Sequence, residues 1–223
     1  MPISYSSKSE GQLRWKFLIQ PEHFEGSNQV NPVRPILRHF DDWLSKQYGV
    51  MVFTQDPQCV LRIQICPLRH AVELPDGTLP NESSALLIHW WNERASIIPA
   101  KGPTLAWALE TSRRMRYSLR LIARYLQENP ACKDIQAVGG ITAHVVLGKP
   151  DGGRVMLEHL GFIVIPYQRP MGAFGEFWEN FFTWWLMWTY NPASTRRRSM
   201  FNLERTEFWM SRTAFIEKYG KRR

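Results

Sequence analysis

The sequence predicts an α+β domain, in which a mixed, mainly antiparallel sheet carries one long packed helix and is followed by a C-terminal helical appendage. Two observations lead to this prediction. Short segments with the two-residue alternation of β-strands occur on both sides of residues 105–128, and that segment itself follows the helical period. The 223 residues are enough to bury one full core. We therefore expect a loose N-terminus at 1–10, the α+β domain at 11–170 and the appendage at 171–223.

The part of the chain before residue 100 is expected to supply one helix and most of the strands. The helix begins at Pro35 and ends at Gly49, because Pro is favoured in the first turn of a helix and Gly just after the last. The pair Asp76-Gly77 predicts a tight turn between two strands. The strands expected from alternation or from short apolar runs are residues 13–19, 50–54, 59–66, 70–74 and 85–91.

The long helix at 105–128 is expected to begin after Thr104, a good N-cap, and to end at Asn129-Pro130. At 100° per residue, its apolar residues form one face and four arginines form another. The apolar face comprises Leu105, Ala108, Ser112, Met115, Leu119, Ile122 and Leu126. The arginine stripe comprises Arg113, Arg116, Arg120 and Arg124. Such a stripe is either a solvated face or an anion-binding surface, and the sequence leaves both interpretations open.

After this helix we expect a strand at 135–147, interrupted by Gly139-Gly140, which indicates a bulge or the close approach of another backbone. A continuous apolar strand at 161–165 is expected to be covered on both faces. Residues 201–219 repeat Phe at every seventh position, which predicts an amphipathic helix. We expect this helix to pair with residues 172–190 as a helical hairpin.

Residues 172–190 are expected to form an aromatic helix, with no charged residue between Asn180 and Tyr190. A membrane-spanning helix needs roughly 20 predominantly apolar residues, so the uncharged part is too short to cross a bilayer. Its rings either pack in the core or lie in the headgroup region, where Trp and Tyr are favoured. In the second interpretation the membrane-contact residues are Trp184, Trp185, Trp188, Arg196, Arg197 and Arg198.

The net charge of +8 is concentrated at the C-terminal end, where nine basic residues stand against three acidic ones after residue 190. A polybasic segment beside an aromatic helix suits an anionic membrane surface or a lipid-linked glycan. Nucleic acid would also attract this charge. Because the sequence carries no stacking platform or recognition motif, we do not expect nucleic acid as the partner.

The three cysteines, Cys59, Cys66 and Cys132, have neither paired spacing nor the spacing of metal ligands. We therefore expect no disulfide, no bound metal and a reducing compartment. The first ten residues lack the apolar core of a signal peptide. These features favour a cytoplasmic protein, placed at the inner face of the membrane if it binds lipid.

The sequence carries no phosphate-binding loop, dinucleotide fingerprint or nucleophile elbow, so it does not decide whether the protein is an enzyme. The candidates for acid–base catalysis are four polar residues in or beside apolar strands, His89, Asn92, Thr142 and His144. Thr142 and His144 are two apart on an expected strand and share a face. Together the four would line a polar pocket at a sheet edge, with a histidine as acid or base. The alternative is that both histidines are hydrogen-bonded structural residues.

Four ordered segments carry a family resemblance. They are Leu74-Pro-Asp-Gly-Thr78, Leu87-Ile-His-Trp-Trp-Asn92, Ser118-Leu-Arg-Leu-Ile-Ala123 with the closing Asn129-Pro130, and Gly139-Gly-Ile-Thr142 with the later Leu160-Gly-Phe162. The chain resembles the YkoP-like domain family over roughly residues 60–165. Members of that family occur alone in bacteria or joined to polysaccharide deacetylase domains. The resemblance therefore implies cell-envelope or glycoconjugate metabolism, and no particular activity.

The order of the expected elements, with strands before and after one long helix, is also similar to that of GNAT-type N-acyltransferases. That resemblance implies an acyl-CoA cofactor such as acetyl-CoA. The family binds the cofactor's pyrophosphate on backbone amides at the start of the long helix, through an Arg/Gln-x-x-Gly-x-Gly/Ala loop. Here residues 98–104 read Ile-Pro-Ala-Lys-Gly-Pro-Thr, and their two prolines lack the amides that such a site needs.

Two functional hypotheses follow from the sequence. The first is a peripheral-membrane accessory protein of bacterial cell-envelope or glycolipid metabolism, which binds anionic lipid or phosphate groups and needs no cofactor. The second is an acyl-CoA-dependent, GNAT-like N-acyltransferase, with the four acid–base candidates around its pocket.

Overall fold

A computed structural model describes residues 33–145, 152–168, 172–195 and 203–221. The chain forms two units, Met1–Asn31 and Pro32–Arg223, and every described residue belongs to the second. The helices of the described part are α1 (Val33–Tyr48), α2 (Leu105–Glu128), the 3-10 helix η1 (Pro130–Cys132), α3 (Gly152–His159), α4 (Gly172–Tyr190), α5 (Pro192–Thr195) and α6 (Arg212–Tyr219). Its strands are β1 (Leu61–Pro67), β2 (Val72–Leu74), β3 (Gly77–Leu79), β4 (Ser84–Trp90), β5 (Ala137–Val145), β6 (Ile163–Pro166) and β7 (Leu203–Ser211).

The strands form a mixed five-stranded sheet and a separate two-stranded hairpin. The large sheet has the order β1-β4-β5-β7-β6, and β2 pairs with β3 through a turn at Pro75-Asp76, one residue before the expected Asp76-Gly77. Only β4 and β5 are parallel, and α2 makes the crossover between them. All the other neighbouring strands are antiparallel. The α+β prediction, with a mainly antiparallel sheet and a long helix, is confirmed.

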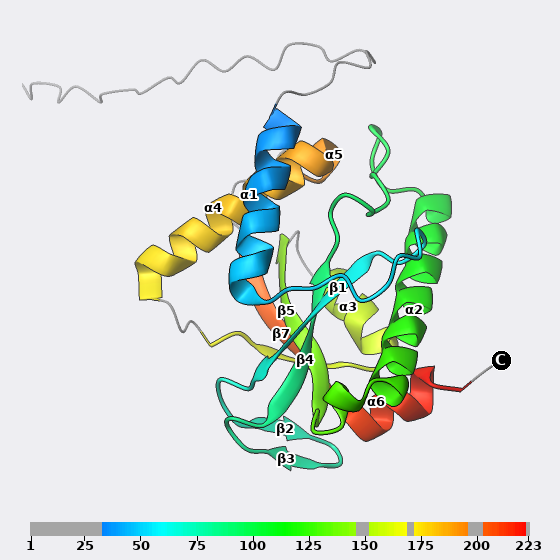
Figure 1. The fold of residues 1–223 in the computed structure, drawn as a ribbon. Coiled ribbons are helices and arrows are strands. Elements are labelled where there is room, and N and C mark those ends of the chain that lie inside the picture. Colours follow the sequence, from blue (N-terminus) through cyan, green and yellow to red (C-terminus); the bar gives the residue numbers. More distant parts are fainter. Residues whose placement is uncertain (1–32, 146–151, 169–171, 196–202, 222–223) are drawn as a thin grey trace, which may run out of the picture. The chain divides into compact units, whose positions relative to one another are not determined.

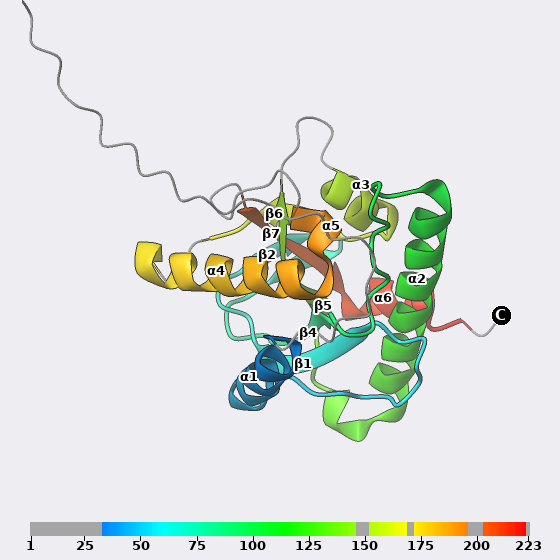
Figure 2. The same cartoon turned by 90° about the horizontal axis from the view of Figure 1, so that it is seen from above.

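Helices cover the large sheet on both faces. Figures 1 and 2 show α2, α3 and α6 on one side of it and α1 and α4 on the other. Toward α2, the strands contribute Ile63, Leu86 and Phe208 to the main hydrophobic core. Because successive strand residues point to opposite faces, their neighbours Leu87 and Trp209 belong to a second, smaller cluster, shared with the β2–β3 hairpin. The two faces therefore have separate cores.

The long helix has the predicted ends. The side chain of Thr104 accepts a hydrogen bond from the Trp107 backbone amide at 3.2 Å, and Asn129 is the C-cap. Most of the expected apolar face, from Met115 onward, is buried against the sheet. Leu105 was assigned to the same face but is 77% exposed, because the first turns of α2 extend past the main core. The prediction for this helix is confirmed except at its N-terminal end.

The predicted helix over residues 201–219 is wrong in its first half. Residues Leu203–Ser211 form β7, which lies between β5 and β6, and only Arg212–Tyr219 is helical. The expected hairpin with residues 172–190 therefore does not form. A strand with neighbours on both sides is part of the sheet, so the expected boundary at residue 170 does not separate the sheet from an appendage. Both faces of β7 are covered, and its sequence consequently lacks a clean polar alternation.

Three smaller expectations about strands have different outcomes. Residues 50–54 do not form a regular strand and contribute one isolated bridge, between Met51 and Ile63. The strand predicted at 161–165 is β6, which lies at the edge of the sheet with half-buried side chains, because only β7 pairs with it. The strand expected at 13–19 lies outside the described residues.

The two glycines of β5 allow the close backbone approach that the sequence indicates. Gly139 pairs with Trp209 and Gly140 pairs with Phe208 in the β5–β7 ladder. A Cβ atom on Gly139 would overlap both the Phe208 carbonyl oxygen and the Trp209 indole. A Cβ on Gly140 would come to 2.8 Å from the carbonyl oxygen of Ile88 on β4. Glycine is therefore required where β5 packs against both of its neighbours.

Candidate functional site

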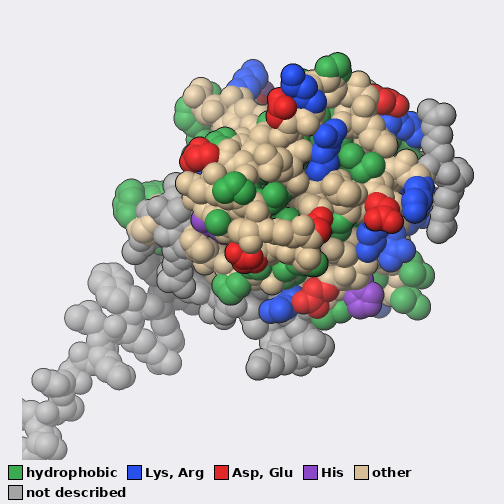
Figure 3. Space-filling model, turned by 90° about the horizontal axis from the view of Figure 1, so that it is seen from below, with side chains coloured by type: hydrophobic (Ala, Val, Ile, Leu, Met, Phe, Trp, Pro, Cys, Tyr) green, Lys and Arg blue, Asp and Glu red, His purple; other side chains and the backbone are tan. Residues whose placement is uncertain are grey.

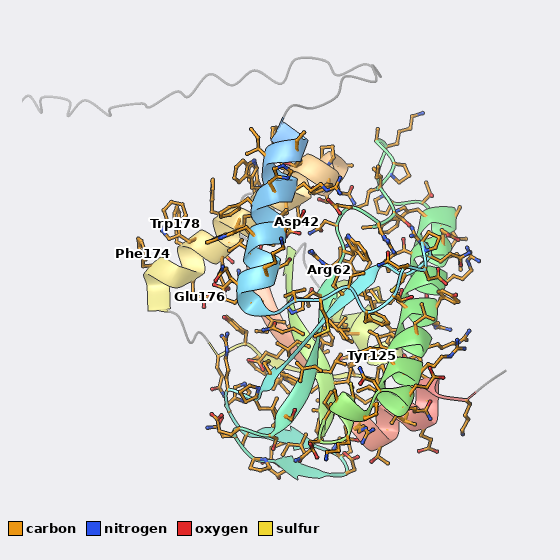
Figure 4. All side chains as sticks on the ribbon, viewed as in Figure 1. Asp42, Arg62, Tyr125, Phe174, Glu176 and Trp178 are labelled. Carbon is orange, nitrogen blue, oxygen red and sulfur yellow. The ribbon has the colours of Figure 1, made fainter. Side chains whose placement is uncertain are left out.

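An exposed aromatic surface lies on the two helices that cover one face of the sheet. We call aromatic surface five exposed rings of α1 and α4, Phe40, Trp43, Phe174, Phe177 and Trp178. Tyr48 and Trp188, near the C-terminal ends of the same helices, are exposed as well. Phe174 is 78% exposed, and Trp43 and Trp178 are each about half exposed. Figure 4 shows Phe174 and Trp178 pointing away from the sheet, whereas Glu176 lies between α4 and the strands.

The rings of the aromatic surface make direct contacts within two groups. Phe40 stacks on Trp43 with ring centroids 5.8 Å apart, and it meets the half-buried Phe182 of α4 edge-on at 5.3 Å. On α4, Trp178 contacts Phe174 at 6.2 Å and Phe177 at 5.4 Å. The contact of Trp178 with Phe174 follows from helix geometry, because residues four apart on α4 lie above one another. The exposed rings therefore form two groups, one where α1 meets α4 and one at the start of α4.

The predicted membrane-contact residues have different positions in the fold. Trp188 is 43% exposed and stacks on Trp184, with centroids 6.5 Å apart. Trp184 and Trp185 are half-buried, and the buried indole N–H of Trp184 has no hydrogen-bond partner within the described part of the chain. Arg196, Arg197 and Arg198 lie outside the described residues. The most exposed rings are therefore at the start of α4, before the tryptophans that the sequence singled out.

Beneath the aromatic surface, charged side chains link α1 to the sheet. Arg62 on β1 is only 8% exposed, and its Nη2 donates to the Asp41 carboxylate of α1 at 2.8 Å. Its Nη1 donates to the Ser45 hydroxyl at 3.0 Å. Asp41 and Ser45 are four apart, so both face the sheet from the same side of α1. This arrangement leaves Phe40 and Trp43 on the outer side.

A second ion pair holds α4. The guanidinium of Arg205 on β7 contacts the Glu179 carboxylate and lies 4.0 Å from that of Glu176. It also donates from Nε to the amide oxygen of Asn180 at 3.0 Å. Burial lowers the pKa of Arg205, while Tyr167 and Glu176 oppose that shift. Both acidic residues of α4 are thus turned toward the sheet, and the outward face of α4 carries no carboxylate.

The structure does not bring the four acid–base candidates together. His89 on β4 is half-buried, and its Nε2 donates to the Gln64 side-chain oxygen at 2.9 Å. Its neighbour Ile88 is in the main core, so His89 faces the α1 and α4 side. Thr142 lies four residues after Val138 on β5, so both side chains point to the same face of the sheet. Val138 is in the main core, and Thr142 therefore faces the α2 side. The sheet separates His89 from Thr142.

Neither of the other two candidates has a described contact with His89. Asn92 is half-buried just after β4. His144 is placed only by its backbone, opposite Glu204 in the β5–β7 ladder, and its side chain lies outside what the structure describes. Burial, and secondarily the charge of Arg62, lower the pKa of His89 from 6.5 to about 4. The His89 imidazole is therefore neutral near pH 7.

A buried carboxylate also lies on this side of the sheet. It belongs to Glu207 of β7, which is 4% exposed. Its carboxylate accepts hydrogen bonds from the Trp209 indole at 3.0 Å and from His70 Nε2 at 2.9 Å. The other ring nitrogen of His70 lies 2.9 Å from the carbonyl oxygen of Ala71. Burial lowers the pKa of His70, but the Ala71 carbonyl and the Glu207 carboxylate outweigh it and raise the pKa overall. Both ring nitrogens face acceptors, as the imidazolium requires.

A cationic groove lies on the opposite side of the sheet, between α2 and α6. Two adjoining hollows of about 570 and 700 Å³ share Arg120, Tyr219 and Lys221. The basic residues that line this cationic groove are Arg116, Arg120, Arg124, Lys218 and Lys221, with His159 at one end. Figure 3 shows basic side chains gathered on the side formed by α2 and α6, with acidic ones among them. The acidic lining residues are Glu128 and Glu217.

Three of the four arginines predicted to bind anions line this groove, and the fourth does not. Arg113 makes a two-pronged contact with Glu110, one turn earlier on α2, from Nε and Nη2 at 3.0 Å each. It is absent from the lining of both hollows. Lys218, Lys221 and His159 were not predicted as site residues. Lys218 belongs to the segment misassigned as one long helix and Lys221 follows it, so their approach to α2 was not foreseeable.

Within the described ranges, no group of three or more His, Cys, Asp or Glu side chains is arranged to hold a metal ion. The three cysteines are free thiols. Among the same residues, every helix is too short or too polar to cross a lipid bilayer. The sites available for function are therefore the aromatic surface, the polar layer beneath it and the cationic groove.

Comparison with known proteins identifies one family. Residues 40–219 match the family model described as the YkoP domain, which covers most of α1 and all the later elements. No curated protein and no solved structure matches the chain. The matched range includes both β7 and α6. This agrees with the fold, in which β7 is a strand of the sheet and α6 packs on one face of it.

Proposed function

The chain belongs to the YkoP domain family, and from that premise we propose that it is a peripheral-membrane accessory protein that binds an anionic bilayer through its aromatic surface. The observation that carries this proposal is the set of exposed rings on the neighbouring helices α1 and α4, which form one group at the contact of the two helices and a second at the start of α4. Exposed apolar patches of this kind mark contact sites in soluble domains. Rings of Trp and Phe on amphipathic helices are favoured at the level of lipid headgroups.

The charges around the aromatic surface support contact with an anionic leaflet. Glu176 and Glu179 are engaged by Arg205, so the outward face of α4 is free of carboxylates. On α1, the exposed Lys46 follows Trp43 by three positions and lies beside it on the helix, with the exposed Asp42 as its neighbour one turn earlier. A basic side chain near an anionic membrane contributes about 1 kcal/mol.

The cellular setting remains part of the proposal. We place the protein at the cytoplasmic face of a bacterial membrane, in cell-envelope or glycolipid metabolism, where its partner is anionic lipid or a lipid-linked glycan. The basic cluster Arg196–Arg198 follows α5 in sequence and would add attraction to the same leaflet. Penetration of the rings would remove apolar area from water, worth about 25 cal/mol per Å².

Vesicle flotation tests the proposal. We expect the protein to bind vesicles containing phosphatidylglycerol and to bind neutral phosphatidylcholine vesicles much more weakly. The variant Phe174→Ala/Trp178→Ala should bind the anionic vesicles about tenfold more weakly, because two exposed rings are lost. Both residues are exposed, so the free energy of unfolding should change little.

The matched control is Leu105→Ala/Leu109→Ala, which removes two exposed apolar side chains from α2, on the other side of the sheet. This variant should bind vesicles as the unaltered protein does. Equal binding to neutral and anionic vesicles, no binding to either, or an equal loss in the two double variants would reject the proposal.

A second candidate is an acyl-CoA-dependent N-acyltransferase, favoured by one observation. The parallel pairing of β4 with β5 covers three residue pairs and ends at Leu87 and Gly139, while the nearby end of α2 exposes Leu105 and Leu109. Beyond these residues β4 does not pair with β5, which leaves strand backbone that an extended ligand could pair with. The Trp107 amide is already used by Thr104, which removes one donor for a pyrophosphate. Calorimetry with acetyl-CoA decides, and no heat of binding at millimolar ligand would eliminate this candidate.

A further inference from the structure

The cationic groove carries a net positive charge, with five cations against two carboxylates in its lining. Arg116, Arg120, Arg124, Lys218 and Lys221 have no salt-bridge partner among the residues that the structure describes. Like charges so close together repel one another and lower stability. Such an arrangement is expected where a ligand supplies the opposite charge.

Other described arginines differ in this respect. Arg62 is paired with Asp41, and Arg205 with the carboxylates of α4. Arg212, next to the groove in sequence, donates to the carbonyl oxygens of Lys133 at 3.0 Å and Leu126 at 3.1 Å. The guanidiniums of Arg116, Arg120 and Arg124 have no such acceptor within the described part of the chain. These three lie on one face of α2, each four residues from the next.

Helix dipoles explain only part of the cluster. Lys218 lies in the last turn of α6, where a cation is favoured by the helix carbonyls. Arg116 and Arg120 lie two or more turns before the end of α2, beyond the reach of that effect. The cations of the groove therefore come from separate elements, and the helix dipole accounts for Lys218 but not for Arg116 and Arg120.

We infer that the cationic groove binds a small, soluble ligand bearing phosphate groups, at a site distinct from the aromatic surface. Guanidinium groups bind phosphate through paired hydrogen bonds, and lysines add charge. Five cations against two carboxylates suit the several negative charges of a diphosphate better than a single carboxylate. The hollows have the volume of small-molecule sites, about 300–1,000 Å³.

The position of the groove argues against a lipid headgroup as its ligand. The groove is formed by α2 and α6, and the aromatic surface by α1 and α4, on the other face of the sheet. Both views of the fold place these pairs of helices on opposite sides (Figures 1 and 2). A flat bilayer in contact with the aromatic surface cannot reach the groove, so its ligand must come from solution.

Calorimetric titration with inorganic pyrophosphate at 0.15 M salt, about physiological ionic strength, tests the inference. We expect one bound pyrophosphate per chain, and binding about tenfold or more weaker in Arg116→Gln/Arg120→Gln, because charge-assisted bonds are lost. The control Arg113→Gln/Arg154→Gln removes the same charge from two exposed arginines that are paired with Glu110 and Glu158. It should bind as the unaltered protein does.

A second readout needs no variant. Addition of pyrophosphate should shift the backbone amide resonances of Lys218, Tyr219 and Lys221 in the unaltered protein, and leave those of α4 unchanged. Failure of pyrophosphate to bind, equal weakening in the two double variants, or shifts confined to other regions would overturn the inference. So would a loss of phosphatidylglycerol vesicle binding in Arg116→Gln/Arg120→Gln, because the groove would then serve a membrane. The aromatic-surface variant should retain pyrophosphate binding, so each proposal can fail alone.

Discussion

Arg62 and Asp41 form a charged hydrogen bond of 2.8 Å between the edge strand β1 and the helix α1. Their side chains are 10% and 19% exposed, so water screens the pair only partly. A buried charge that loses its partner is costly, whereas an exposed pair contributes little. Because α1 also carries Phe40 and Trp43, this bond positions two of the five rings of the aromatic surface.

We expect Asp41→Asn to lower the free energy of unfolding by about 2–3 kcal/mol, because it leaves the Arg62 guanidinium buried without a counter-charge. The matched control is Asp42→Asn, at the next residue, where the carboxylate is exposed (Figure 4). That variant should change stability by less than about 0.5 kcal/mol. Urea unfolding followed by tryptophan fluorescence measures both, and equal effects would show that the pair does not hold α1.

The sequence predicted the elements whose signals are local. Thr104 and Asn129-Pro130 mark the ends of α2, and Asp76-Gly77 marks the β2–β3 turn to within one residue, because caps and turns depend on a few adjacent residues. Strand β7 was missed for the opposite reason. Its residues Glu207 and Phe208 point to different covered faces, so no alternation of polar and apolar residues distinguishes it from a helix.

The candidate sites were predictable only in part. Helical spacing placed Arg116, Arg120 and Arg124 on one face of α2, but the lysines of α6 reach them through the tertiary fold. Likewise, Phe40 has the spacing of a core residue, and only the packing of α1 leaves it exposed. Spacing within one element specifies a face, and it does not specify what covers that face.

The expectation that His89 and Thr142 line one pocket could not be checked from the sequence, for a related reason. Whether residues on two neighbouring strands point to the same face of the sheet depends on the register of the strands. The β4–β5 register places Leu87 beside Gly139. A shift of one residue would have placed the side chains of His89 and Thr142 on the same face. Register is set by turns and core packing across the whole domain, which no short motif contains.

His89 should make the protein less stable in acid. Its pKa is lowered to about 4 in the folded state, against 6.5 when unperturbed. Between these values the unfolded chain binds a proton that the folded chain does not, so stability falls as pH decreases from 6.5 toward 4. The loss should reach up to about 3 kcal/mol at pH 4. In His89→Gln this part of the pH dependence should vanish, as urea unfolding at pH 7, 5.5 and 4.5 can test.

His70 should act in the opposite direction. Its pKa is raised in the folded state, because the Ala71 carbonyl and the Glu207 carboxylate together outweigh the effect of burial. The stabilisation is therefore complete below pH 6.5 and is lost as pH rises through the folded value. Titration of the His70 ring by NMR measures the shift directly. In His70→Gln the decline in stability above pH 6.5 should disappear, and an unchanged decline would assign it to another group.

The packing of β5 against β7 leads to a prediction about Gly139. A methyl group there would overlap the Phe208 carbonyl, which belongs to the backbone and cannot turn aside, and the Trp209 indole, which is packed in the second core. We expect Gly139→Ala to cost about 3 kcal/mol or more, because overpacking at a backbone contact forces the strands apart. The control is Gly102→Ala, in open space at a φ of +108°. It carries only the conformational penalty of a side chain at positive φ, about 1 kcal/mol. Thermal unfolding of both variants should rank Gly139→Ala as the more damaging, and the reverse order would mean that β5 and β7 are less closely packed than the structure shows.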